Sequence, residues 1–237
     1  MTDHCKQIIE TLGCECLLFE NETDGDKIIS SYKSLISEGK TKGFTPLIIV
    51  ADDRLAEMLE DNFEDSSPAK YVYNTQIKDS YSFFAERRDY YSDMLDDADS
   101  DEIPENCIGG IDTFSTHMDI ISKKVCDEII IAKIPTDKPW ELALWFPMGG
   151  WNDCPLPEEQ AAVFKYWYEE YGAYPAIVTG DTWELYAERP VADRTAAKQL
   201  ANEMYLFCTD IVDQGVGSIS SLAETLLDSS VWFFWWD

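Results

Sequence analysis

The sequence has few basic residues and almost no histidine. It contains 18 Lys and Arg against 46 Asp and Glu, a formal net charge of −28, and only two histidines, His4 and His117. A protein that binds nucleic acid through its phosphates needs Lys and Arg to displace counterions, and anionic lipid makes the same demand. We therefore expect neither nucleic acid bound through its phosphates nor a membrane surface as a partner.

The sequence also lacks targeting and membrane-spanning signals. Its first ten residues contain no cationic segment followed by an apolar run, and the best apolar run, residues 231–236, is far shorter than a membrane span. An odd number of scattered cysteines is typical of reduced thiols in a cytosol. We expect a cytoplasmic protein in which most thiols are buried as small apolar groups. The cysteines are Cys5, Cys14, Cys16, Cys107, Cys126, Cys154 and Cys208.

Motifs for nucleotides, metals and hydrolysis are missing. The chain has no Gly-x-Gly-x-x-Gly, Walker, Gly-x-Ser-x-Gly or His-Glu-x-x-His pattern. Residues 97–101 resemble the start of an EF-hand loop, but Glu102 replaces the required Gly and Ile108 the bidentate Glu. Residues 14–16, even with the nearby His4, lack the second cysteine pair of a zinc site. We therefore predict no metal and no cofactor.

What is present favours a folded chain. Hydrophobic residues make up 45% and aromatic residues 13%, enough apolar surface to offset the entropy of ordering. The length of 237 residues suits one domain or two small ones. The densest acidic stretch, residues 93–105, has no base and indicates an exposed loop. We expect a variable α/β half over residues 1–106 and a second domain over residues 107–237, unless both form one compact unit.

The spacing of apolar residues predicts an α/β fold. In the first half, alternating elements suggest a layer with some parallel pairing. The expected helices there cover residues 3–12, 26–37, 52–59 and 81–95, and the expected strands cover residues 14–19, 47–50 and 69–74. In the second half we expect strands at residues 128–134, 176–179 and 182–187 and helices at residues 139–145, 157–171, 193–207 and 218–227. The predicted fold is a central mixed β-sheet flanked by helices.

All eight tryptophans follow residue 139, which predicts a Trp-rich C-terminal half with the end of the chain folded back onto it. A buried indole N–H needs an acceptor, and we expect Asp210, Asp213 and Asp237 to supply it. The tryptophans are Trp140, Trp145, Trp151, Trp167, Trp183, Trp232, Trp235 and Trp236.

Four motifs of the second half resemble the core signature of a bacterial family of unknown function. They are Gly-Gly-Trp-Asn-Asp-Cys-Pro at 149–155, Tyr-Trp-Tyr-Glu-Glu-Tyr-Gly-Ala at 166–173, Phe-Cys-Thr-Asp-Ile-Val-Asp-Gln-Gly at 207–215 and Trp-Phe-Phe-Trp-Trp-Asp at 232–237. The resemblance covers about residues 128–237. This chain departs from it at residues 189–191, where it has Arg-Pro-Val and members of the family often have a Pro-Pro pair. The resemblance implies no biochemistry of its own. Such proteins resemble small acidic members of toxin–immunity gene clusters, which implies an immunity-type role.

The loop at residues 149–155 is the first candidate site. Gly149 and Gly150 permit positive φ or a close backbone approach, and Asn152 can bond the backbone or a ligand. Cys154 is a possible nucleophile, although neither histidine stands in a motif that pairs with it. The alternative is a rigid turn with Trp151 buried.

The segment at residues 208–215 is the second candidate. Asp210, Asp213 and Gln214 could cap helix ends, line a pocket, or join Asp153 and Asp237 around Mg²⁺ or Ca²⁺, although no spacing demands a metal. We assign none of the candidates a catalytic or metal-binding role. The full set of candidate pocket residues is Gly149, Gly150, Trp151, Asn152, Asp153, Cys154, Trp167, Tyr171, Cys208, Asp210, Asp213, Gln214, Trp235, Trp236 and Asp237.

Three functional hypotheses remain open at this point. The first is a non-catalytic, immunity-type protein that captures a basic protein partner, because an acidic field steers basic proteins toward it. The second is an enzyme or small-ligand binder that uses both loops as one pocket. The third is a DNA mimic that acts through charge alone. The sequence does not determine the oligomeric state.

Overall fold

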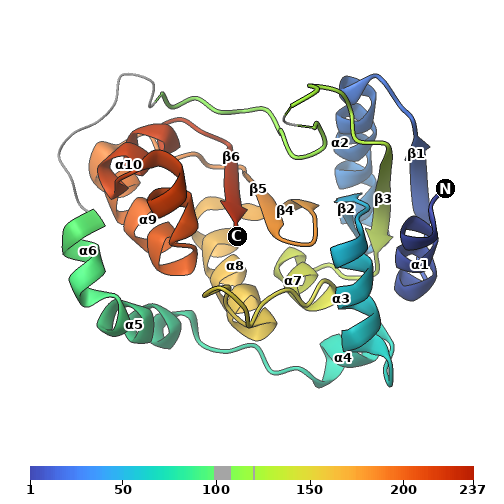
Figure 1. The fold of residues 1–237 in the computed structure, drawn as a ribbon, viewed down its shortest axis with the longest axis horizontal. Coiled ribbons are helices and arrows are strands. Elements are labelled where there is room, and N and C mark those ends of the chain that lie inside the picture. Colours follow the sequence, from blue (N-terminus) through green and yellow to red (C-terminus); the bar gives the residue numbers. More distant parts are fainter. Residues whose placement is uncertain (99–107, 120) are drawn as a thin grey trace. The chain divides into compact units, whose positions relative to one another are not determined.

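The computed structural model describes residues 1–98, 108–119 and 121–237 (Figure 1). It divides into two compact units that are interleaved in the sequence. The first unit contains Met1–Gln76, Phe114–Met148 and Pro175–Glu184, and the second contains Ile77–Thr113, Gly149–Tyr174 and Leu185–Asp237. The predicted boundary at residues 106 and 107 lies outside the described residues, as do residues 99–105 of the acidic stretch and Cys107. The division into sequence halves therefore stays a prediction.

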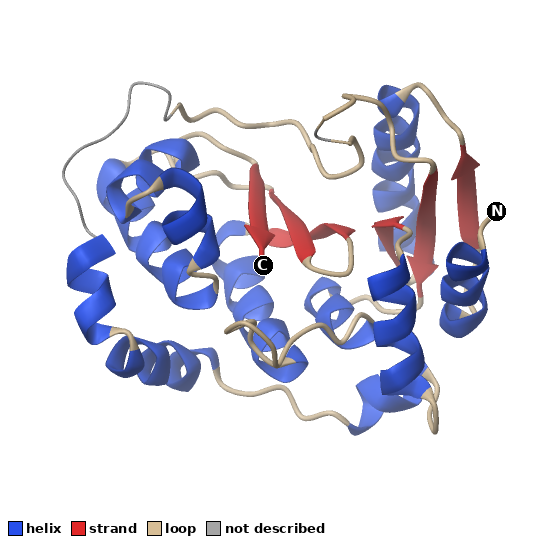
Figure 2. Ribbon diagram, in the orientation of Figure 1, coloured by secondary structure: helices blue, strands red, loops and turns tan. Residues whose placement is uncertain are grey.

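A six-stranded mixed sheet runs in the order β1-β3-β2-β4-β5-β6, and helices flank it (Figure 2). Strand β3 pairs antiparallel with β1 and β2, whereas β2 pairs parallel with β4. This confirms the predicted α/β fold with a mixed sheet. The strands are β1 Cys16–Glu20, β2 Thr45–Val50, β3 Glu128–Ile134, β4 Ala173–Val178, β5 Thr182–Ala187 and β6 Val231–Trp235.

Side-chain caps fix the helix starts of the first unit. Thr2, Asp24 and Asp52 each accept a hydrogen bond from a backbone N–H in the first turn, and Gly13 and Gly43 end helices in the left-handed conformation. Helix α2 packs on β2, and α1 packs on α3. The helices of this unit are α1 Asp3–Leu12, α2 Gly25–Lys42, α3 Asp53–Phe63, α4 Pro68–Asn74, the 3₁₀-helix η1 Pro139–Glu141 and α7 Leu142–Trp145.

The prediction of a strand at residues 69–74 is wrong, because this segment forms helix α4. Ser67 accepts from the Lys70 backbone N–H, and Pro68 occupies the first turn, so the Ser-Pro pair starts a helix. The aromatic and β-branched residues that favoured a strand do not line a buried sheet face: Tyr73 is 89% exposed.

The second unit is mainly helical, and one of its predicted helices is divided. We expected residues 81–95 to form one helix; instead α5 ends at Tyr90, the backbone of Tyr91 leaves the helical region while its side chain is buried, and α6 begins at Ser92. Helix α9 packs against α5 and α10. The helices are α5 Ser80–Tyr90, α6 Ser92–Ala98, α8 Pro157–Tyr171, α9 Arg194–Phe207, the π-helix η2 Ile211–Val216 and α10 Ile219–Leu226.

An aromatic core fills the second unit. The Trp167 ring stacks on Phe234 with centroids 5.4 Å apart and meets Phe207 and Trp232 edge-on at 5.2 Å and 5.8 Å. Strand β6 supplies both Trp232 and Phe234, so the end of the chain completes this core. The expected Trp-rich C-terminal region is present.

The expected indole acceptors are wrong for two tryptophans. Trp167 Nε1 donates to the Glu203 carboxylate at 3.2 Å, and Trp232 Nε1 donates to the Ser229 carbonyl at 3.3 Å. Trp236 Nε1 is buried and finds no acceptor in the part of the chain that the structure describes. Among the described residues, none of the helices combines the length and apolar character needed to cross a bilayer.

Candidate functional site

The loop at residues 149–155 is a turn held in unusual backbone geometry. Gly149 and Gly150 have φ of +132° and +80°, and Asn152 and Asp153 have φ of +43° and +59°. Two backbone hydrogen bonds close the turn, from Gly150 N to the Cys154 carbonyl at 3.0 Å and from Cys154 N to the Trp151 carbonyl at 2.8 Å. Positive φ at Asn and Asp costs energy, so the surrounding contacts must hold this loop in one conformation.

The loop is packed onto the start of α8. A Cβ on Gly149 would lie 1.9 Å from the Pro155 carbonyl oxygen, so only glycine fits there. The buried Gln160 amide donates to that same oxygen at 2.8 Å and lies 3.6 Å from Cys154 Sγ. Because Cys154 is only 4% exposed, it does not present a nucleophile to solvent.

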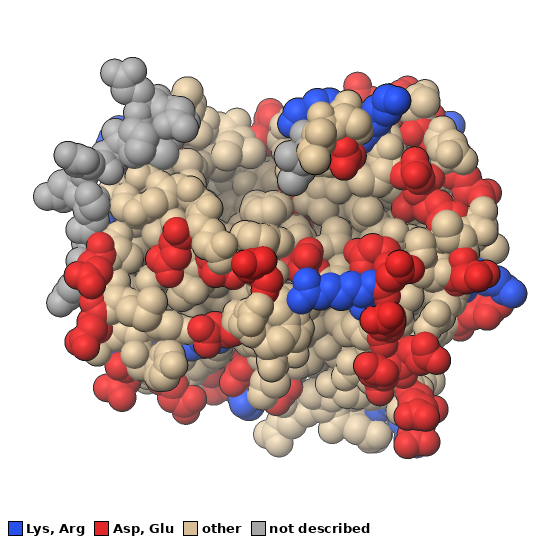
Figure 3. Space-filling model, in the orientation of Figure 1, with Lys and Arg blue, Asp and Glu red and all other residues tan. Residues whose placement is uncertain are grey.

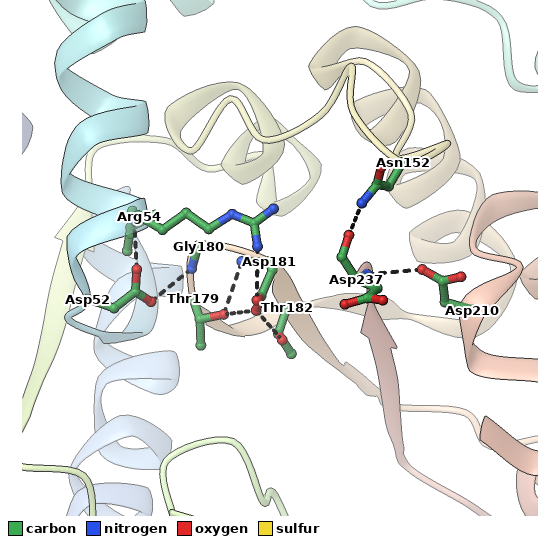
Figure 4. Close-up of polar contacts among 10 residues, drawn as sticks. Asp52, Arg54, Asn152, Thr179, Gly180, Asp181, Thr182, Asp210 and Asp237 are labelled. Carbon is green, nitrogen blue, oxygen red and sulfur yellow. Dashed lines mark hydrogen bonds and ion pairs between the residues drawn. The ribbon is translucent and has the colours of Figure 1, made fainter. Parts of the chain in front are cut away.

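The two candidate loops come together at Asp237. Asn152 Nδ2 donates to the Asp237 carbonyl oxygen, and Asp237 N donates to Asp210 Oδ2 at 3.0 Å (Figure 4). Gln214 Nε2 donates to the other Asp210 oxygen at 3.1 Å. The close-up shows Asn152 and Asp210 reaching Asp237 from different elements. The sequence motifs at 149–155, 207–215 and 232–237 are thus joined by hydrogen bonds.

Asp213 lies beside this chain of contacts and interacts with Tyr205. Partial burial raises the pKa of the Asp213 carboxyl, the hydrogen bond from the Tyr205 hydroxyl opposes that rise, and the neighbouring Asp210 charge adds to it. Burial raises the pKa of Tyr205 to about 12, so its hydroxyl keeps its proton and acts as a donor. Asp213 and Tyr205 on α9 therefore influence each other's pKa.

Helix α5 supports the loop from the other side. Arg87 donates to the Asp153 carbonyl oxygen at 2.5 Å and to the Tyr91 hydroxyl at 2.9 Å, and its guanidinium lies over the Phe83 and Tyr91 rings. Tyr91 in turn meets the Tyr205 ring at 6.5 Å. Residues from three segments that are distant in sequence thus hold Asp153 and Asp213 in place.

We call Asp153, Asp210, Asp213 and Asp237 the aspartate cluster. Three of these residues are exposed and Asp210 is half-buried. In the described part of the chain, none of the four carboxylates forms an ion pair with Lys or Arg, and three cations of this unit form ion pairs with glutamates instead. Those ion pairs are Lys78 with Glu158 and Glu159, Lys165 with Glu169, and Arg194 with Glu224.

The cluster is a charged surface and not a coordination sphere. Within the ranges that the structure describes, no three His, Cys, Asp or Glu side chains are placed to hold a metal ion. Acidic side chains also spread widely over the face of the molecule in Figure 3, where basic ones are sparse.

The remaining candidate residues lie in or against the core. Cys208 is buried, its Sγ lies 3.1 Å from the Trp235 carbonyl oxygen, and burial raises the pKa of its thiol to about 12. Tyr171 meets the Trp232 ring at 5.5 Å, and Trp236 meets the Phe207 ring at 5.5 Å. With Trp167 at the core centre, these side chains support the site without forming its surface.

Sequence reasoning missed Arg87, Tyr91, Tyr205 and Glu203. Arg87 lies on α5 and Tyr91 follows its last residue, both far from the motifs in sequence, and no local pattern connects them to the loop. Glu203 had a usable signal, because it lies three residues after Leu200 on the apolar stripe of α9 and is only 7% exposed. Burial raises the pKa of its carboxyl, while donation from Trp167 and Tyr166 opposes the rise.

Comparison with known proteins finds a family model that matches the second half of the chain. No curated protein and no solved structure matches the chain. Residues 130–237, which include every candidate pocket residue, match the model of the family described as Domain of unknown function (DUF4253), and this confirms the predicted resemblance to a domain-of-unknown-function family.

Proposed function

We propose that this chain is a non-catalytic, immunity-type protein of the bacterial cytoplasm that captures a basic protein on the aspartate cluster. The observation that carries the proposal is that none of these four carboxylates forms an ion pair with Lys or Arg in the described part of the chain, while Arg87 bonds the main-chain oxygen of Asp153. A cation from another protein can therefore pair with them without first displacing an internal Lys or Arg.

The cluster is also well ordered before any partner arrives. Asp210 accepts from Asp237 N and from Gln214, Asp213 contacts Tyr205, and Arg87 holds the Asp153 backbone. A surface that is already fixed loses less conformational entropy on binding than one that must be ordered. The net charge of −28 would additionally steer a basic partner toward it over long distances.

The chemistry of the site favours binding over nucleophilic catalysis. Cys154 and Cys208 are both buried, and the two histidines belong to the first unit, whereas the cluster belongs to the second. One observation supports the alternative of an enzyme or small-ligand binder: the raised pKa of Asp213 is a feature that general bases share. That alternative, in which both loops form one pocket, predicts that the single change D213N is enough to weaken binding.

The test compares two variants with equal charge. The site variant carries D153N, D210N, D213N and D237N; the control variant carries E57Q, D61N, E64Q and D65N, at four exposed acids of the first unit. We expect the site variant to bind a deca-arginine peptide about tenfold more weakly than the wild type at low ionic strength, and the control less than about threefold more weakly.

The pattern of losses distinguishes the hypotheses. Equal losses in both variants mean that charge alone governs binding, as expected of a DNA mimic, and contradict the proposal. A single D213N variant is measured beside them, and a loss as large in D213N as in the four-site variant supports the small-ligand alternative. A pull-down from the native cytosol at low ionic strength should recover a basic protein with the control variant and not with the site variant; recovery of no basic protein by the wild type also contradicts the proposal.

A further inference from the structure

Strand β1 forms one edge of the sheet. It comes first in the order of strands, and among the described residues no strand lies on its other side (Figure 1). Its residues Cys16, Leu17, Leu18 and Phe19 are apolar, and each of them is only half-buried. An apolar edge strand with unpaired main-chain groups is a template on which a further strand can form.

The hydrogen bonds to β3 show which main-chain groups of β1 point away from the sheet. In an antiparallel pair, residues that exchange hydrogen bonds alternate with residues that do not. Just before β1, the Glu15 carbonyl accepts from Lys133 N at 2.8 Å, and just after it Asn21 N donates to the residue before β3 at 2.8 Å. Odd-numbered residues of this segment therefore bond β3, and even-numbered residues direct their N–H and C=O groups outward. The outward groups belong to Cys16, Leu18 and Glu20.

A hollow of about 590 Å³ lies between this strand and helix α2. Leu17 of β1 and Leu35 of α2 form its apolar part. Side chains alternate between the two faces of a strand, so a strand laid along β1 would direct every second side chain into the hollow beside Leu17. Main-chain groups on an edge and a pocket for alternate side chains are the two parts of a strand-addition site. The other lining residues are Lys27, Ser30, Ser31 and Ser34.

The charges around the hollow are paired within the chain. Lys27 pairs with Glu22 beyond one end of β1, and Lys133 pairs with Glu15 at 2.5 Å beyond the other. Glu20 pairs with the N-terminal amino group. The edge is therefore locally balanced, although the whole chain carries a net charge of −28. This balance favours an uncharged segment, whereas a second copy of the chain would bring a further −28 and be repelled.

We infer that an extended, uncharged segment of a partner protein, with aliphatic side chains at alternate positions, adds to β1 as a further strand. Its main chain exchanges hydrogen bonds with Cys16, Leu18 and Glu20, and its aliphatic side chains cover Leu17 and Leu35. The inference is independent of the proposed function, because β1 and α2 belong to the first unit and the aspartate cluster to the second. Failure of either proposal leaves the other unaffected.

The experiment adds the blocked peptide acetyl-Thr-Val-Thr-Val-Thr-Val-Thr-amide to the full chain and follows amide hydrogen exchange by NMR. In the chain without peptide, we expect the amides of Cys16, Leu18 and Glu20 to exchange faster than those of Leu17 and Phe19, because only the latter two bond β3. Saturating peptide should slow the three outward amides by about tenfold or more and leave the other two unchanged.

Two variants of α2 give a matched comparison of binding. Ser34 and Ser37 are both exposed, but only Ser34 lines the hollow. We expect S34F, which fills the hollow, to bind the peptide at least about tenfold more weakly than the wild type, and S37F to stay within about twofold. L18P removes one outward N–H without removing a bond to β3, and it should also weaken binding.

Three results would overturn the inference. The first is a wild-type chain that does not bind the peptide, or binds it without slowing the outward amides. The second is equal affinity in S34F and S37F. The third is a wild-type dimer in sedimentation that S34F dissociates, because a second copy would then occupy the edge. Circular dichroism shows whether each variant is folded, and the exchange result on the wild type stands even if a variant is not.

Discussion

Replacing Gly149 by alanine perturbs the candidate loop at its most constrained position. The backbone there has φ of +132°, a conformation that side chains rarely tolerate, and the new Cβ would lie 1.9 Å from the Pro155 carbonyl oxygen. The contact is with backbone, so the chain must move and the Gln160 hydrogen bond to that oxygen must weaken. Backbone strain costs about 1–3 kcal/mol and a lost buried hydrogen bond about 1–3 kcal/mol, so we expect G149A to destabilise the protein by about 4 kcal/mol.

The neighbouring Gly150 gives a matched control. Its φ of +80° also strains an alanine, but the nearest atom to its Cβ is Leu156 Cδ2 at 3.5 Å, an ordinary contact. We expect G150A to cost only about 1–2 kcal/mol, the strain of a left-handed residue. Urea denaturation followed by tryptophan fluorescence measures both. Equal losses of unfolding free energy for G149A and G150A would refute the claim that the loop is locked onto α8.

Three further predictions concern buried groups. E203A should cost about 2–4 kcal/mol, because it leaves Trp167 Nε1 and the Tyr166 hydroxyl without their acceptor, whereas E203Q should cost about 1 kcal/mol; urea denaturation compares them. Burial raises the pKa of Glu203 above 4.5, so the stability contributed by the protonated carboxyl is lost as pH rises through the folded pKa. Urea denaturation at pH 4–7 should therefore show the free energy of unfolding of the wild type falling relative to that of E203Q as pH rises. Burial lowers the pKa of His117 below 6.5, so the protein loses stability as pH falls below that value. In thermal melts, the melting temperature of H117Q should fall less with decreasing pH than that of the wild type. An equal dependence of melting temperature on pH in both proteins would contradict this reasoning.

Local signals predicted most of the secondary structure. Asp193 and Ser218 cap helices as their positions indicate, and α8 begins at Pro157 and stops at Gly172, which adopts the left-handed conformation. These signals work because caps and glycine stops act on the nearest backbone groups. They fail when two local signals conflict, as at Ser67 and Pro68, where the helix start outweighs a strand-like composition.

The sheet order and the site surface could not be predicted in the same way. Antiparallel pairing of β3 with β1 and β2 joins segments about a hundred residues apart, and nothing in either segment names its partner. The motifs indicated the right region, but they did not separate Trp167 and Cys208, which are buried, from Asp213 and Asp237, which are exposed. That separation depends on packing across several elements.

The most direct test of the proposed function is the dissociation constant of the wild type and the two four-site variants for the deca-arginine peptide, measured at one low ionic strength. Each variant loses four negative charges, so the long-range attraction between the protein and the basic peptide falls equally in both. If the aspartate cluster is the binding surface, the variant with D153N, D210N, D213N and D237N binds about tenfold more weakly, while the variant with E57Q, D61N, E64Q and D65N stays within about threefold of the wild type. Indistinguishable dissociation constants for the two variants would contradict the account.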